Sequence, residues 1–306
     1  MGTTNLSLPQ PPGLAETSRV DSWWAQPLFT FLGLLAFVIY LTWAAFQGVH
    51  YWHDGNPAAA WQPQYLSPAY SPVLYRMTAD ADGTPLPGVA PADHALLGEW
   101  PGWLPRQVLF VTLTPAFLIL WGPGLFRFTC YYYRGAYYKA FWADPLNCGV
   151  GEPSFRGGKY LGERFLPLVL HNIHRYALYI AILFIFILTY DAIISYIWIR
   201  RDGQGVVTGH TFGIGIGSLI ITMNVILLSG YTFGCHSLRH LVGGGLNRLA
   251  GRPLRKKTYD CVSCLNRGHM KWAWASLIWV GFTDIYIRIA SMNEWNDALF
   301  VIGGTQ

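Results

Sequence analysis

Uncharged apolar runs are the feature that most limits what this chain can fold into. Residues 28–47 hold no charged side chain, and apolar residues also dominate 108–126, 167–199, 211–234 and 272–289. About 20 such residues cross the roughly 30 Å hydrocarbon core of a bilayer as a helix. Only 12% of the residues are charged, about half the usual share in a soluble domain. We therefore predict an all-α integral membrane bundle with about five transmembrane helices.

Two of these predicted spans depart from a simple helix. The span 108–126 contains Pro115 and the run Gly122-Pro123-Gly124, which predicts a kink or an early end. The span 167–199 would be about 50 Å long at about 1.5 Å per residue. Because that length exceeds the hydrocarbon core, this helix must tilt or project from the membrane.

Small and charged residues inside the spans predict packing contacts. Gly213 and Gly217 have the small-xxx-small spacing that lets helices approach closely. Asp284 and Arg288 are four residues apart and are expected to form an ion pair that faces the bundle. Asp191 has no obvious local partner and is expected near the outer interface, where charge costs less.

The loop charges predict the orientation of the chain. The loop 49–107 is acidic and rich in Pro and Gly, whereas 127–166 and 235–271 are rich in Lys and Arg. The positive-inside rule places the two basic loops in the cytoplasm. Residues 1–27 then form a cytoplasmic N-terminal segment, residues 28–306 form the transmembrane domain, and the C-terminus lies outside the cytoplasmic membrane. The net charge of +5 is assigned to these loops and not to nucleic-acid binding.

Thiols and imidazoles gather at the predicted cytoplasmic ends of the spans. They are Cys130, Cys148, His171, His174, Cys235, His236 and His240. Two facing His suit a haem iron, whereas two Cys with two His suit a Rieske-type [2Fe-2S] cluster, and a zinc site is chemically possible. The alternative is that these are interfacial His and buried Cys with no cofactor. Because polar groups are costly in a membrane, the group as a whole favours a metal or quinone role.

Two further stretches carry aromatic or thiol groups. Residues 130–142 are aromatic and basic, which predicts a helix along the inner interface. Aromatic walls beside an Arg donor also suit a quinone headgroup; the alternative is a simple interfacial belt. Cys261-Val-Ser-Cys264 is a single C-x-x-C, and we interpret it as an incidental pair in a reduced loop.

Five stretches between about Phe126 and Ile289 carry a family resemblance. They are Phe128-Thr-Cys-Tyr-Tyr-Tyr-Arg134, Tyr137-Tyr-Lys-Ala-Phe-Trp142, Asn172-Ile-His-Arg-Tyr176, Cys235-His-Ser-Leu-Arg-His240 and His269-Met-Lys-Trp-Ala-Trp-Ala-Ser276. Together they resemble the single-chain membrane anchor of succinate dehydrogenase found in actinobacteria. The combination is specific, although no single motif is.

The resemblance implies a redox function. Such an anchor holds a flavoprotein (FAD) subunit and an iron–sulfur subunit on its cytoplasmic face and passes their electrons to a membrane quinone. It also implies a Rieske-type [2Fe-2S] cluster in the anchor. The usual Rieske boxes C-x-H and C-x-x-H are absent from this chain, so haem b stays an alternative.

The resemblance also implies which residues form the site. The candidate metal ligands are Cys130, Cys148, His174, Cys235, His236 and His240. The candidate quinone region comprises Tyr131, Arg134, Arg175 and Trp272. A higher oligomer of the complex is consistent with this reading. The alternative from a different class is a structural or transport subunit of the membrane without a cofactor.

Overall fold

The structure is a computed structural model. It describes residues 22, 24–80, 82–109, 111–141, 173–203, 206–244, 251–295 and 297–302. Two compact units are present: residues 1–38 with 127–173, and residues 39–126 with 174–306. Cys148, His171 and the predicted cytoplasmic segment up to residue 21 lie outside the described residues.

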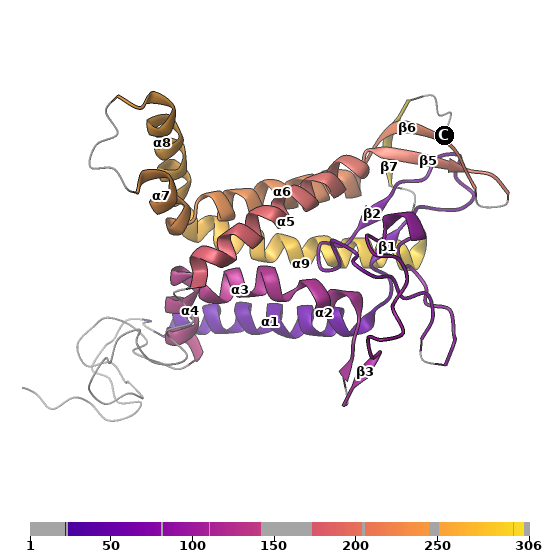
Figure 1. Cartoon of the computed structure of the whole chain (residues 1–306), viewed down its shortest axis with the longest axis horizontal. Coiled ribbons are helices and arrows are strands. Elements are labelled where there is room, and N and C mark those ends of the chain that lie inside the picture. The colour runs from indigo at the N-terminus through magenta and orange to yellow at the C-terminus, as the bar shows by residue number, and fades with distance from the viewer. Residues whose placement is uncertain are drawn as a thin grey trace, which may run out of the picture. The chain divides into compact units, whose positions relative to one another are not determined.

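Three of the described helices are long and apolar enough to cross a membrane (Figure 1). They are α1 (Ala25–Gln47), α5 (His174–Ile194) and α6 (Ile216–Phe233). Helix α9 (His269–Asn293) has the length of a span, but polar and charged residues along it keep it outside this group. A helical membrane protein is therefore supported, with three spans identified among the described residues where about five were expected.

Within the second unit, α6 packs along both α5 and α9 (Figure 1). The contact forms because aliphatic and small side chains line the facing sides. Ala192, Ile221 and Ile287 come from the three helices and pack together with the buried Tyr65. Trp279 adds a side-chain hydrogen bond from its indole nitrogen to the Ile220 carbonyl at 3.0 Å. These contacts fix α9 against the two apolar helices.

The second predicted span is wrong in its first half. The segment forms a hairpin and then two short helices: β3 (Gln107–Val108), β4 (Val111–Thr112), α2 (Pro115–Ile119) and α3 (Trp121–Thr129). Pro115 lies in the first turn of α2, where its missing N–H costs nothing. Pro123 has no N–H to donate to the Ile119 carbonyl, so the helix is interrupted between α2 and α3. The predicted kink is confirmed.

The all-α expectation is also wrong at the ends of the third and fourth predicted spans. Helix α5 ends at Ile194, and the next residues enter an antiparallel sheet of order β5-β6-β7. Its strands are β5 (Ile197–Arg201), β6 (Val207–Gly215) and β7 (Ala298–Val301). Alternating β-branched and aromatic residues favour a strand here. The excess length of the third span at this end is therefore strand, and residues 167–172 lie outside the described part.

The long predicted loop 49–107 is largely irregular, as expected, but it has its own core. Its regular elements are β1 (Trp52–His53), β2 (Tyr65–Leu66) and the 3-10 helix η1 (Ala92–His94). The Tyr51 and Tyr70 rings stack at 4.2 Å in the centre of this core. We call residues 48–114 the loop module.

The predicted basic segments contain short helices, of which α7 and α8 are amphipathic. Helix α4 (Tyr131–Phe141) belongs to the first unit, and α7 (His236–Gly243) and α8 (Pro253–Arg267) belong to the second. Helix α8 contacts the end of α6, where the Asn266 side chain donates a hydrogen bond to the Gly234 carbonyl at 2.8 Å. In the second unit, α7 and α8 lie at one end of α6 and the β5–β7 sheet lies at the other (Figure 1).

Candidate functional site

A histidine and a cysteine meet where α5 begins and α6 ends. His174 is the first residue of α5, and Cys235 directly precedes α7. The His174 Nε2 atom lies 3.1 Å from the Cys235 Sγ atom, and both side chains are buried. They are 61 residues apart in the sequence, and the antiparallel packing of α5 and α6 brings them together. An imidazole nitrogen facing a thiol is a donor pair that suits a transition metal.

A row of four aromatic rings begins at the His174 imidazole. Phe126 stacks on the His174 imidazole at 4.8 Å and meets the Tyr231 ring edge-on at 5.3 Å. Tyr231 in turn stacks on His269 at 5.0 Å. The four residues come from four different helices and form an apolar wall with polar atoms at intervals. Such a wall suits a planar aromatic ligand such as a quinone ring.

Trp272 lies beside this row of rings. A Cβ atom at Gly230 would come within 2.6 Å of the Trp272 ring, so the absence of a side chain there lets α6 and the indole approach each other. Trp272 is half-buried, whereas Arg175 is exposed on α5 next to His174. The structure thus brings one candidate quinone residue to the ring row and leaves Arg175 at the surface.

The candidate metal ligand Cys130 and the candidate quinone residues Tyr131 and Arg134 lie in the first unit. Cys130 is buried at the junction of α3 and α4. Arg134 lies over the Tyr131 ring at 4.3 Å, and Arg127 donates a hydrogen bond to the Tyr133 hydroxyl at 2.8 Å. Burial raises the pKa of Tyr133 to about 12 although the Arg127 charge acts in the other direction. The Tyr133 hydroxyl therefore keeps its proton at neutral pH.

His236 and His240 form a separate pair on α7. Their Nε2 atoms lie 2.9 Å apart, and the rings meet edge-to-face at 4.4 Å. This confirms that the two imidazoles share one helix face. Desolvation lowers the pKa of His236, and the nearby His240 and Arg239 lower it further. A neutral His236 is able to accept the hydrogen bond from the second ring.

The described residues do not assemble a complete metal site. No group of three or more His, Cys, Asp or Glu side chains with metal-binding geometry occurs among them. Of the six predicted ligands, His174 and Cys235 touch, His236 and His240 form their own pair, and Cys130 belongs to the other unit. The four ligands of a Rieske-type cluster are therefore not supported as a set. His269 joins the ring row although sequence reasoning did not select it; its position opposite the buried end of α6 depends on tertiary packing.

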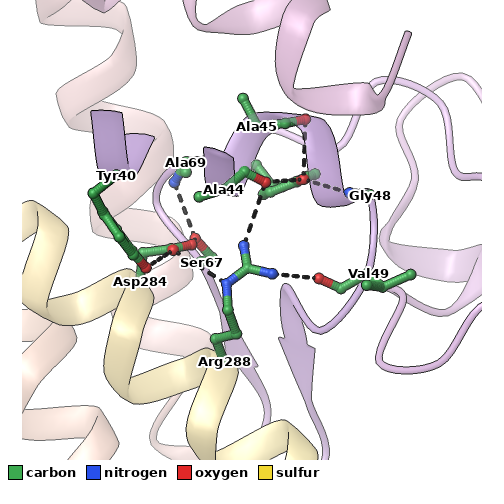
Figure 2. A network of polar contacts seen from close by, with 10 residues as sticks. Tyr40, Ala44, Ala45, Gly48, Val49, Ser67, Ala69, Asp284 and Arg288 are labelled. Atoms are coloured by element: carbon green, nitrogen blue, oxygen red, sulfur yellow. Dashed lines mark hydrogen bonds and ion pairs between the residues drawn. The ribbon is translucent and has the colours of Figure 1, made fainter. Parts of the chain in front are cut away.

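A second buried polar network lies nearer the other end of α9 (Figure 2). The predicted ion pair is confirmed: the Arg288 Nε and Asp284 Oδ2 atoms are 3.5 Å apart, and both side chains are buried. The hydroxyl groups of Tyr40 and Ser67 donate to the Asp284 carboxylate. Arg288 donates to the Val49 carbonyl at 2.8 Å. This network joins α1, α9 and the loop module.

Asp191 is also buried and has partners that the sequence did not reveal. The Ser71 hydroxyl donates to its carboxylate, and the His94 Nε2 atom lies 3.7 Å from it. Both partners belong to the loop module. Asp191 and Asp284 therefore each link one helix to the same module.

The fold and the site are those of a mainly helical membrane protein, with three helices long and apolar enough to cross a bilayer among the described residues and buried Cys, His and aromatic side chains at one end of α5 and α6. The chain belongs to the family of the actinobacterial succinate dehydrogenase subunit SdhC, whose model matches residues 25–293. It is similar to a solved chain of the Mycobacterium smegmatis Sdh1 complex in the apo form. The two share 40% identity with a TM-score of 0.74, over 98% of this chain and 97% of that chain. No curated protein matches the chain significantly.

Proposed function

We propose that this chain is the membrane anchor of a succinate:quinone oxidoreductase. In this role it holds a flavoprotein subunit and an iron–sulfur subunit and passes their electrons to a membrane quinone. The family assignment and the similarity to a chain of the Sdh1 complex support the assembly. The observation that carries the redox part is the buried contact of His174 with Cys235 inside the row of aromatic rings.

The basic helices support a docking role at the same end. Helix α8 carries Arg255, Lys256, Lys257 and Arg267 against Asp260, and it contacts the end of α6 that leads to Cys235. A positive surface favours encounter with an acidic partner, and the positive-inside rule assigns it to the cytoplasmic side. We therefore propose that the soluble subunits dock over the end of the helices that carries the His174–Cys235 pair, with the N-terminus inside and the C-terminus outside.

His174 and Cys235 are proposed as two ligands of a mixed imidazole and thiolate iron site. When bound, a [2Fe-2S] cluster supplies one-electron transfer. Cys130, Cys148, His236 and His240 stay proposed as ligands on the strength of the sequence. Haem b is the alternative group; the His174 imidazole would then be a candidate ligand of its iron and would supply the same one-electron transfer.

The aromatic rings and the hydroxyl groups are proposed to serve the quinone. Reduction of a quinone to the quinol takes up two electrons and two protons, so the pocket needs apolar walls and nearby proton donors. The rings of Phe126, Tyr231 and Trp272 provide apolar walls. Tyr131 and Arg134 of helix α4, in the first unit, stay proposed as hydrogen-bond partners of the quinone on the strength of the sequence.

The test uses the whole complex with His174→Ala or Cys235→Ser in this chain. Both variants should lose most of the iron and acid-labile sulfide that this chain contributes, and quinone reduction should fall at least about tenfold. Succinate oxidation with a soluble artificial acceptor should be retained, because the flavoprotein is unchanged. Cys264→Ser is the matched control, since Cys264 is an exposed thiol on α8.

Three outcomes separate the alternatives. Sharp cytochrome bands in the reduced-minus-oxidised spectrum would show that the cofactor is haem b and not a cluster. Unchanged iron content and wild-type quinone reduction in both variants would show that the pair binds no redox metal. If this chain contributes no iron to the wild-type complex, the result would support an anchor without a cofactor.

A further inference from the structure

The hairpin β3–β4 ends in an apolar turn that is exposed on the protein. Val108 pairs with Val111, and Leu109 begins the turn between the two strands. The Leu109 side chain is 85% exposed, and the nearby Trp103 side chain is 75% exposed. Val108 is also exposed. The segment that carries β3 projects away from β1 and β2 (Figure 1).

The backbone of this turn makes the choice of residue unusual. Leu109 has a φ of +55°, in the left-handed region that Gly, Asn and Asp adopt most readily. A water-exposed hairpin of this kind normally has Asn-Gly or Asp-Gly at its turn. The same loop module has such a polar turn: Gly83 follows Asp82 with a φ of +83°, and the Asp80 side chain accepts a hydrogen bond from the Thr84 backbone. At Leu109 a backbone in the left-handed region carries an apolar side chain, and exposing that side chain to water is unfavourable.

The position of the hairpin along the chain indicates that lipid covers the turn. Helix α2 begins at Pro115, only a few residues after β4. The hairpin therefore stands at the place where the chain enters the apolar part of the second unit. Three extended residues reach about 10 Å, which matches the depth of about 5–10 Å at which interfacial elements are buried in a bilayer. Trp103 and Arg106 come just before β3 in the sequence and are exposed, and Trp and Arg both favour the interface.

We propose that the β3–β4 hairpin inserts its Leu109 tip into the lipid leaflet at the loop-module end of the helices, with Trp103 at the headgroup level. The hairpin then acts as a shallow second attachment of the loop module to the membrane. Only the tip enters the acyl region, because deeper insertion would leave the edges of a two-stranded sheet without hydrogen-bond partners in hydrocarbon. The proposal does not depend on the redox function.

The test is photo-crosslinking of the whole complex in native membranes, with p-benzoylphenylalanine at position 109. Thr84 is the matched control, because it is exposed in the polar turn of the same module. Irradiation should attach lipid to the peptide that carries position 109, seen by mass spectrometry, and should attach at least about tenfold less lipid at position 84. A protein–protein crosslink at position 109, either to a second copy or to another subunit, would overturn the proposal. Equal labelling at both positions would also overturn it.

A second measurement covers the case in which this replacement impairs assembly. In vesicles that contain brominated lipids, the loss of tryptophan fluorescence should be smaller in Trp103→Phe than in the wild type. Lipids brominated near the headgroups should quench Trp103 more than lipids brominated deep in the acyl chains. No difference between Trp103→Phe and the wild type would show that Trp103 does not reach the lipid.

Discussion

The buried pair of Asp284 and Arg288 gives the sharpest test of how the second unit is held together. Side-chain exposures are 1% for Asp284 and 4% for Arg288, so neither charge is screened by water. Replacing Asp284 with Ala leaves the guanidinium buried without its carboxylate. It also removes the acceptor for the Tyr40 and Ser67 hydroxyl groups.

The expected magnitude follows from these contacts. Breaking a buried ion pair by removing one partner costs about 3–5 kcal/mol, and each hydroxyl that loses its acceptor adds about 1 kcal/mol. We expect Asp284→Ala to destabilise the chain by about 5–7 kcal/mol. The double variant Asp284→Leu with Arg288→Met should cost much less than the sum of the two single changes, because no uncompensated charge remains.

The assay is unfolding of the purified protein in mild detergent, followed by circular dichroism as a denaturing detergent is added. The control is Lys256→Ala, which breaks an ion pair with the same spacing of four residues. The Lys256–Asp260 pair is 61% and 58% exposed, so its loss should cost less than about 0.5 kcal/mol. If Asp284→Ala costs no more than Lys256→Ala, or if the double variant is as unstable as the sum of the singles, the reasoning is refuted.

Two further predictions concern the ring row and the loop module. Gly230→Ala should displace Trp272, because the added Cβ atom would lie 2.6 Å from the Trp272 ring, and it should raise the KM for quinone. The control is Gly124→Ala, whose added Cβ atom would meet nothing within 4 Å and should leave the KM unchanged. Burial lowers the pKa of His53 against the opposing effect of Asp297, so acid protonates the unfolded chain first. Stability should therefore fall as the pH drops below about 6.5, the pKa of histidine in an unfolded chain, and thermal unfolding of His53→Gln should show a weaker pH dependence.

Patterns local to one helix were predicted well from the sequence. The apolar run of α1 was placed within a few residues of its observed bounds. The pairing of Asp284 with Arg288 follows from a spacing of four residues on one helix, which fixes their distance whatever the surroundings. The break between α2 and α3 follows from the missing N–H of Pro123. In each case the cause lies within a few residues.

Features that depend on distant partners were not predictable. The apolar residues of β5 continue the run of α5, and an apolar run alone does not distinguish a strand from a buried helix. Gly213 and Gly217 do permit a close approach, but to the rings of Trp198 and Tyr65 instead of another helix. The meeting of His174 with Cys235 needs the packing of α5 on α6. The sequence predicted which residue types form the site, but it did not predict which of the candidate residues come together.

Helix α9 connects the two buried polar regions and gives them a common mechanical role. His269 and Trp272 lie in its first turn beside the ring row, and Asp284 with Arg288 lies about four turns further on. The ion pair fixes the rotation of α9 because Arg288 also donates to the Val49 carbonyl in the loop module. A helix held in this way keeps its first turn in a fixed orientation towards α6. In the complex, loss of the pair should therefore raise the KM for quinone and lower stability together, whereas Gly230→Ala should change the KM with a smaller loss of stability.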